Sequence, residues 1–175
     1  MLAFGIDPGS LKTGWGVLSI EGSRARMVDC GVIMAPSSRE LPARLAIISE
    51  ELGQLLERHR PDGAFLESIF HAKSARSALI LGHARGVAML ACERAGLSVL
   101  EISPSEVKKA VSGSGRAEKS QVAEMIRVLL GLPQVAQEDA SDALAVAFAG
   151  ATRTRFANTL AASVVASKAR GRRRR

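Results

Sequence analysis

The chain has 175 residues, of which 47% are hydrophobic, and it carries a formal net charge of +7. This length allows one domain with a substantial core but not two large ones. No apolar stretch reaches the roughly 18 residues that a membrane-spanning helix requires, and the first ten residues lack the basic start and apolar core of a signal peptide. The composition therefore argues against a membrane protein, and we expect a cytoplasmic one.

Most of the positive charge lies at the C-terminal end. The last eight residues, KARGRRRR, hold six Lys or Arg and no acid, so the remainder of the chain has a net charge near +1. We expect residues 1–155 to form the folded domain and residues 156–175 a basic, disordered tail. Such a tail is either a solvated end or a weak, salt-sensitive contact to nucleic acid.

The first half of the chain predicts strands followed by a helix. Apolar runs with turn-rich linkers predict strands at 2–7, 14–20 and 26–34, and the short linkers predict that they pair antiparallel. Apolar residues then recur every three or four positions from Leu41 to Leu55, which predicts an amphipathic helix that ends at Arg60-Pro61-Asp62-Gly63.

The second half alternates strands and helices. Strands at 64–67 and 97–103 flank a long helix over 72–95, and three further helices open at Ser103, near Val122 and at Asp139, the last of them ending near Thr152. Crossovers through helices make the later strands parallel. The predicted fold class is α/β, with a five-stranded mixed sheet flanked by helices.

The long helix over 72–95 carries a stripe of small residues. Ala78, Gly82 and Gly86 recur at intervals of four and therefore share one face. Such a face would let another backbone approach closely. That backbone belongs either to the protein's own sheet or to a second copy of the chain.

Acidic residues stand where the predicted strands and the last helix leave the core. Asp7 ends the first strand in FGIDPGS, Glu67 ends the fourth in FLESIF, and Asp139 and Asp142 open the last helix in EDASDALAVA. Each has an ordinary alternative: Asp7 as a turn residue before Pro and Gly, Glu67 as a surface charge, and the helical pair as capping acids.

Together these four acids predict a metal site. Acids at the ends of neighbouring parallel strands emerge at one edge of the sheet, and a helix covering the sheet can aim residues three apart at them. Four close carboxylates repel one another unless divalent cations lie among them, and oxygen ligands favour Mg²⁺ or Mn²⁺ over zinc. We expect Asp7 at the centre, as the ligand that bridges the ions.

Five stretches follow one another along the chain: IDPGSLKTGWGV, FLESIF, LGHARG, SPSEVKKAVSGSGRAEKSQV and DASDALAVA. Together, over residues 2–152, they resemble the RuvC family of Holliday junction resolvases, which have an RNase H-like fold. The resemblance implies a homodimer that cuts four-way DNA junctions in recombination and repair, by paired nicks in strands of like polarity. It also implies two Mg²⁺ or Mn²⁺ ions per active site and a branch-migration motor complex as a further partner.

The resemblance places the acidic site on Asp7, Glu67, Asp139 and Asp142, although some members of the family have histidine at the Asp139 position. It implies further contacts to DNA. Lys108 and Lys119 approach the phosphates, and Lys119 lies close enough to stabilise the transition state; alternatively, Lys119 is only the exposed start of a helix.

Phe70, shortly after Glu67, either stacks on an unpaired base at the junction or enters the core at the start of the helix. Ser74 and Arg76 stand where the family has an amide and an acid, which leaves the local DNA contacts open.

The remaining candidates have weaker support. His59, His71 and His83 lie 12 residues apart, match no metal-binding motif and are expected to be surface or packing residues. Alternative functions are an actin-like or sugar-kinase-like ATPase, a pre-rRNA-processing nuclease of the same superfamily, and a non-catalytic DNA-binding module. The ATPases duplicate the fold and are longer than this chain.

Overall fold

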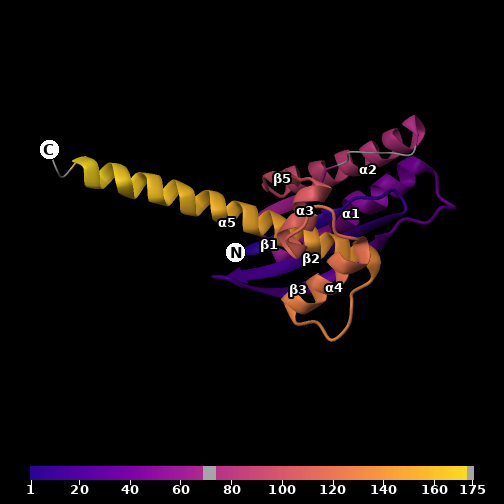
Figure 1. Cartoon of the computed structure of the whole chain (residues 1–175). Coiled ribbons are helices and arrows are strands. Elements are labelled where there is room, and N and C mark those ends of the chain that lie inside the picture. Colours follow the sequence, from indigo (N-terminus) through magenta and orange to yellow (C-terminus); the bar gives the residue numbers. More distant parts are fainter. Residues whose placement is uncertain (69–73, 173–175) are drawn as a thin grey trace.

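The computed structural model describes residues 1–68 and 74–172, with the backbone alone at 158–172. In this part of the chain, five strands form one sheet in the order β3-β2-β1-β4-β5 (Figure 1). The strands are β1 (Leu2–Asp7), β2 (Lys12–Glu21), β3 (Arg24–Met34), β4 (Gly63–Glu67) and β5 (Val99–Ile102). The first three pair antiparallel, β4 pairs parallel with β1, and β5 pairs parallel with β4. The predicted mixed sheet is confirmed.

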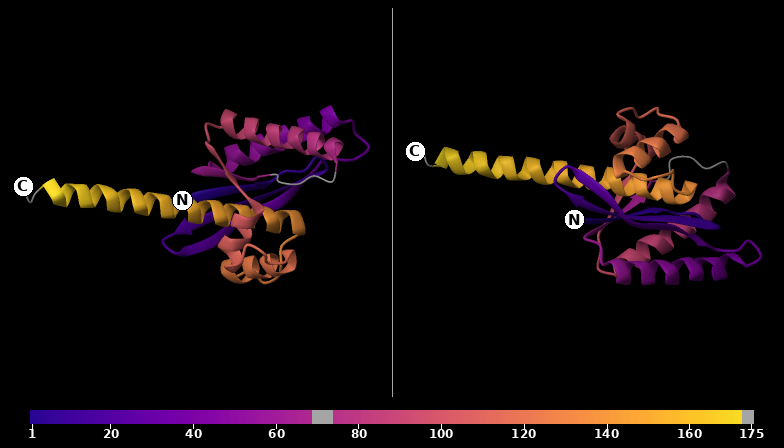
Figure 2. Two further views of the ribbon diagram at one scale, coloured as in Figure 1. Left: turned by 45° about the horizontal axis from the view of Figure 1, so that its top comes forward. Right: turned by 90° about the horizontal axis from the view of Figure 1, so that it is seen from below.

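Helices cover both faces of the sheet (Figure 2). One face carries α1 (Leu41–His59) and α2 (Ala75–Arg94), and the other carries α3 (Pro104–Ser112), α4 (Lys119–Leu130) and α5 (Glu138–Arg172). Each face has its own hydrophobic core, one centred on Ile6, Leu52 and Leu66 and the other on Leu18, Ile102 and Leu144. Within the residues described, no helix is long and apolar enough to cross a membrane.

Local sequence signals set several of the element boundaries. β1 ends at Asp7 because Pro8 has no backbone N–H to continue the ladder. Pro104 begins α3, where the hydroxyl of Ser103 accepts from the N–H of Glu106 and the carboxylate of Glu106 accepts from the N–H of Ser103. α1 ends where Arg60 adopts a left-handed conformation (φ 44°) and donates its N–H to the carbonyl of Leu56.

The last helix is longer than its sequence pattern predicts. The expected end near Thr152 is wrong, because α5 continues as a helix to Arg172. The pattern of buried apolar residues stops where the helix leaves the sheet, but no Gly or Pro interrupts the Ala-rich stretch between Gly150 and Gly171. The expected tail over 156–175 is thus helical as far as Arg172, and its separate role stays a prediction.

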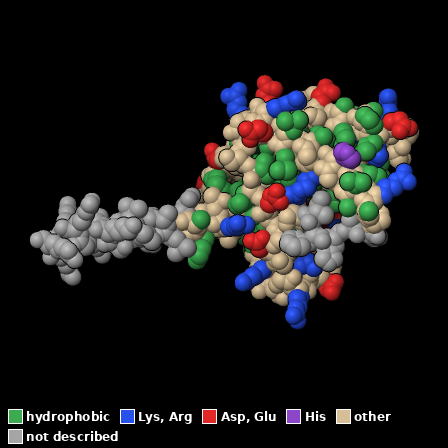
Figure 3. Space-filling model, turned by 90° about the horizontal axis from the view of Figure 1, so that it is seen from above, with side chains coloured by type: hydrophobic (Ala, Val, Ile, Leu, Met, Phe, Trp, Pro, Cys, Tyr) green, Lys and Arg blue, Asp and Glu red, His purple; other side chains and the backbone are tan. Residues whose placement is uncertain are grey.

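The small-residue stripe on α2 faces away from the sheet. A Cβ added at Gly82 or Gly86 would meet no described atom within 4 Å outside its own helix. Packing of the stripe on the protein's own sheet, one of the two alternatives, is therefore wrong. Hydrophobic side chains gather between charged ones on this face (Figure 3), where Leu79 is 67% exposed.

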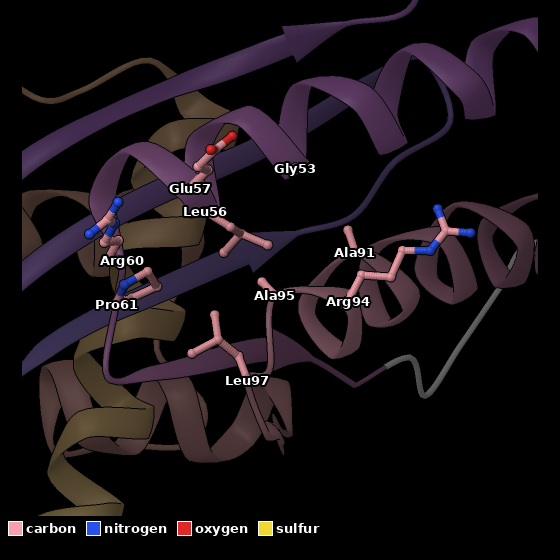
Figure 4. Close-up of a pocket in the computed structure, with 9 residues that line it drawn as sticks. All are labelled: Gly53, Leu56, Glu57, Arg60, Pro61, Ala91, Arg94, Ala95 and Leu97. Atoms are coloured by element: carbon pink, nitrogen blue, oxygen red, sulfur yellow. The ribbon is translucent and has the colours of Figure 1, made fainter.

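A depression lies between the C-terminal ends of α1 and α2 (Figure 4). It has a volume of about 470 Å³ and a floor that includes Leu56, Ala91 and Leu97, with Arg60 and Arg94 at its rim. Pro61 also lines it, just before β4 begins, so it lies at the opposite end of β4 from Glu67.

Glycines let α5 lie directly on the sheet. A Cβ added at Gly5 of β1 would overlap the carbonyl oxygen of Ala143, and a Cβ added at Gly14 of β2 would overlap the carbonyl oxygen of Asp139. At Gly16, the added atom would lie 2.7 Å from a methyl group of Leu144. Because two of these three contacts are with helix backbone, no side-chain rotation can relieve them.

We expect Gly5→Ala to lower the free energy of unfolding by about 1–3 kcal/mol, since the added methyl group must push α5 away from β1. Gly53→Ala is the matched control: Gly53 lies in α1, its added Cβ meets nothing within 4 Å, and the substitution should stabilise the protein by about 0.5–1 kcal/mol. Urea denaturation measures both. Equal stability of Gly5→Ala and the unsubstituted protein would contradict this account of the packing.

Candidate active site

Two of the predicted acids leave the sheet at the same edge. β1 and β4 are adjacent and parallel, and Ile6 lies level with Leu66 in the ladder. Asp7 and Glu67 are the next residues and the last of their strands. The parallel pairing therefore brings two carboxylates together that are 60 residues apart in the chain.

The start of α5 brings the other two acids to this edge. Asp7 pairs in the ladder with Gly14, and the backbone of Asp139 rests directly on Gly14. Asp142 follows three residues later and therefore lies on the same side of the helix. The glycine at position 14 is thus what allows the start of α5 to come this close to Asp7.

The carboxylates are close enough to perturb one another's ionisation. The pKa of Asp7 is raised to about 7, first because the group is buried and then because Glu67, Asp142 and Asp139 add negative charge. Burial also raises the pKa of Glu67, with a further contribution from Asp142. Burial likewise raises the pKa of Asp142, although Lys119 opposes the shift. All four predicted acids therefore belong to one electrostatic cluster.

Lys119 supplies the positive charge beside this cluster. It is the first residue of α4, and its ammonium lies 2.7 Å from Oδ2 of Asp142 and 2.8 Å from Oε1 of Glu138. Burial lowers its pKa, but the hydrogen bonds and charges of the two acids outweigh this effect and raise the pKa above its ordinary value. The side chain is nevertheless 59% exposed. Lys119 thus begins a helix beside the acidic cluster, and its role toward DNA stays a prediction.

A pocket of about 300 Å³ opens at this edge. Its charged lining consists of Glu67, Asp142, Lys108 and Lys119, and its apolar wall includes Val107 and Val122. The pocket thus combines acids that can hold cations with lysines that can meet anions.

Comparisons with known proteins agree with this arrangement. Residues 3–150 match the family model described as crossover junction endodeoxyribonuclease RuvC. A RuvC of Citrifermentans bemidjiense is 52% identical over 147 residues, covering 84% of this chain and 90% of the relative. A RuvC of Sorangium cellulosum is 45% identical over 175 residues, covering 100% of this chain and 98% of the relative.

Among solved structures, that of T. thermophilus RuvC in complex with a Holliday junction substrate superposes with a TM-score of 0.86 at 31% identity, over 90% of this chain and 96% of the other. The chain belongs to the RuvC family. The resemblance found in the sequence is therefore confirmed, and so are the RNase H-like fold and the assignment to a family of crossover junction endodeoxyribonucleases.

RuvC enzymes are nucleases that generally depend on divalent metal ions. The donors here fit such an ion because carboxylate oxygens are the ligands that hard divalent cations take, and because a cation would relieve the repulsion that raises the pKa values of Asp7 and Glu67. In the conformation described, no three His, Cys, Asp or Glu side chains among the described residues are placed to hold a metal ion. The ammonium of Lys119 instead neutralises Asp142.

Other predicted residues have varied positions. Phe70 and His71 lie outside the described residues. His59 is a packing residue, as expected: its ring lies 5.9 Å from that of Trp15 and its Nε2 is 3.2 Å from Asp29. His83 is exposed on α2, also as expected.

The two departures from the RuvC pattern lie at the start of α2. The hydroxyl of Ser74 caps the helix by accepting from the N–H of Ser77, and Arg76 is exposed in the first turn. Ser74 thus has a structural role of its own.

Two residues near the RuvC site were missed by sequence reasoning. Glu138 shares Lys119 with Asp142, and its position directly before Asp139 was the available signal. Arg85 of α2 donates to the carbonyl oxygen of Glu67 and pairs with Glu101. No local pattern predicts the contacts of Arg85, because they depend on how α2 packs against the ends of β4 and β5.

The raised pKa of Asp7 predicts how stability depends on pH. Between its ordinary pKa of 3.8 and about 7, the folded protein keeps a proton that the unfolded chain has lost, so the free energy of unfolding falls as pH rises through this window. Asp7→Asn removes this titration. We expect it to be more stable than the unsubstituted protein at pH 8, with little difference at pH 4.

Urea denaturation in EDTA at pH 4, 6 and 8 measures this effect. Glu50→Gln, which changes an exposed acid of α1, is the control and should leave the pH dependence unaltered. If the free energies of unfolding of Asp7→Asn and of the unsubstituted protein changed with pH in parallel, the expected burial of Asp7 would be contradicted.

Proposed function

We propose that this protein resolves four-way (Holliday) DNA junctions by paired symmetric nicks, as an endodeoxyribonuclease of homologous recombination and DNA repair. The observation that carries the proposal is the meeting of carboxylates from β1, β4 and α5 at one sheet edge, beside two lysines, in a chain of the RuvC family. The junction bound by T. thermophilus RuvC supports the choice of substrate. We also expect the protein to act in the cytoplasm, with a branch-migration motor complex as its partner.

Asp7, Glu67, Asp139 and Asp142 would hold two Mg²⁺ or Mn²⁺ ions, with Asp7 between them. When bound, a pair of such ions supplies a hydroxide nucleophile at neutral pH and neutralises charge on the leaving 3′ oxygen. The protein's own contribution is to hold these carboxylates together despite their mutual repulsion. No Ser, Cys or His nucleophile is then required.

The lysines of the pocket would bind the phosphates. Lys108 and Lys119 line the same pocket as Glu67 and Asp142, so a phosphate held at the acidic site would lie within their reach. Lys119, nearer to Asp142, would oppose the negative charge that grows in the transition state. The Lys and Arg residues at 168–175 would add weaker, salt-dependent attraction to the DNA.

Phe70 would act on the bases rather than on the phosphates. It follows Glu67 by three residues, and an aromatic ring beside the cutting site can stack on a base that is unpaired at the crossover. This role comes from the family resemblance and stays a prediction.

Two symmetric nicks require two active sites related by a two-fold axis, which a homodimer provides. The face of α2 is the surface we propose for it. This face is apolar and exposed, and with α1 it forms a groove of about 460 Å³ lined by Leu45, Ala78, Leu79, Gly82, His83, Gly86, Val87 and Leu90. The open space over Gly82 and Gly86 would let the two α2 helices approach closely.

Asp7→Asn should abolish cleavage while leaving junction binding intact. Loss of a residue that only supports a metal ligand typically costs 10–100-fold, so loss of the central ligand should cost at least about 100-fold. A labelled four-way junction, a linear duplex, structured RNA and ATP, each with Mn²⁺ or EDTA, provide the assay. Glu50→Gln is the matched control. Cleavage by Asp7→Asn at the normal rate would refute the proposed site, and turnover of RNA or ATP instead of the junction would refute the proposed substrate.

Leu79→Lys should convert the dimer to a monomer without unfolding it, because Leu79 is 67% exposed in the isolated chain but would be buried between two α2 helices. Light scattering measures the mass and circular dichroism checks the fold. Val128→Lys is the control, since Val128 is also exposed but lies on α4. A Leu79→Lys protein that stays dimeric would show that another surface forms the dimer.

A further inference from the structure

Arg85 links α2 to the acidic edge of the sheet. Its side chain is only 13% exposed, and its guanidinium makes two contacts: Nη1 donates to the backbone carbonyl oxygen of Glu67, and Nη2 pairs with the carboxylate of Glu101 on β5. We infer that Arg85 is a positioning residue that holds Glu67 in the orientation needed at the active site. The inference rests on the proposed function of Glu67.

The contacts of Arg85 fix the peptide unit that follows Glu67. Its carbonyl group, from Glu67, accepts from Arg85, while its N–H group, from Ser68, donates to the carbonyl oxygen of Ile102 at 2.8 Å. The same peptide plane is therefore held from both sides. Because this fixes the backbone at the end of β4, it also fixes the direction in which the Glu67 side chain leaves the sheet.

Arginine is suited to this position. Its planar guanidinium carries donors that reach two acceptors at once, whereas the ammonium of lysine is a compact charge without a fixed plane. Glu101 orients the guanidinium and balances its charge. The positive charge of Arg85 also favours the ionised form of Glu67, although its influence on the pKa of Glu67 is smaller than those of Asp142 and Lys119.

The geometry separates this role from simple anchoring of α2. α2 is already held by a buried face that includes Ala84, Ala88 and Cys92. Loss of Arg85 leaves that face intact, and Glu101, which is 48% exposed, can be solvated by water. The main group left without a partner is the carbonyl of Glu67, so the consequences should appear at the acidic site.

Arg85→Met and Arg85→Lys test the inference, with Arg94→Met, an exposed arginine in the last turn of α2, as the matched control. Two responses are measured: the Mg²⁺ concentration for half-maximal junction cleavage, and the rise in melting temperature that Mn²⁺ produces without DNA. For Arg85→Met, we expect each of the two responses to require at least about 10-fold more metal, as for other residues that orient metal ligands. Arg85→Lys should lie in between, junction binding in EDTA should be unchanged, and Arg94→Met should behave normally.

A folded Arg85→Met protein with a normal metal response in both assays would overturn the inference, as would an equal change in Arg94→Met. If Arg85→Met does not fold, Arg85→Lys and Glu101→Gln decide by the same criteria. Failure of the unsubstituted protein to cut junctions with any divalent ion would instead refute the proposed function. The Mn²⁺ response without DNA would still report on Arg85.

Discussion

The close packing of α5 on β1 and β2 is the constraint on which the active site depends. Side chains on a sheet normally keep a packed helix away from the strand backbone, but glycines at positions 5, 14 and 16 let the helix backbone rest on the strands. The first turn of α5 therefore reaches the end of β1. Without this approach, Asp139 and Asp142 would lie too far from Asp7 and Glu67 to form one cluster.

The cluster is electrostatically unfavourable by itself. Burial and mutual repulsion raise the pKa values of Asp7, Glu67 and Asp142, so the fold must supply the free energy that keeps them together. Enzymes commonly concentrate such perturbed groups at active sites. Lys119 compensates part of the charge through Asp142, and a divalent cation would compensate more. The site is thus arranged for ligands that bring positive charge.

Sequence patterns predicted the sheet and the edge at which Asp7 and Glu67 emerge, because both depend on local or repeating signals. The strand over 2–7 ends where Pro8 ends it, and acids at the ends of parallel strands must emerge together. Apolar periodicity did not predict the end of α5, because it reports which residues are buried and not where a helix ends. It also missed Arg85, whose partners at Glu67 and Glu101 come together only in the tertiary structure.

The length of α5 separates opposite charges. Its 35 residues span about 50 Å at 1.5 Å per residue. Glu138 and Asp139 lie in its first turn, and the sequence is basic toward its other end. The helix dipole favours this polarity at both ends. While the helix stays continuous to Arg172, the basic residues in its last turns cannot fold back to neutralise the acids of its first turn, so self-inhibition by this route is excluded.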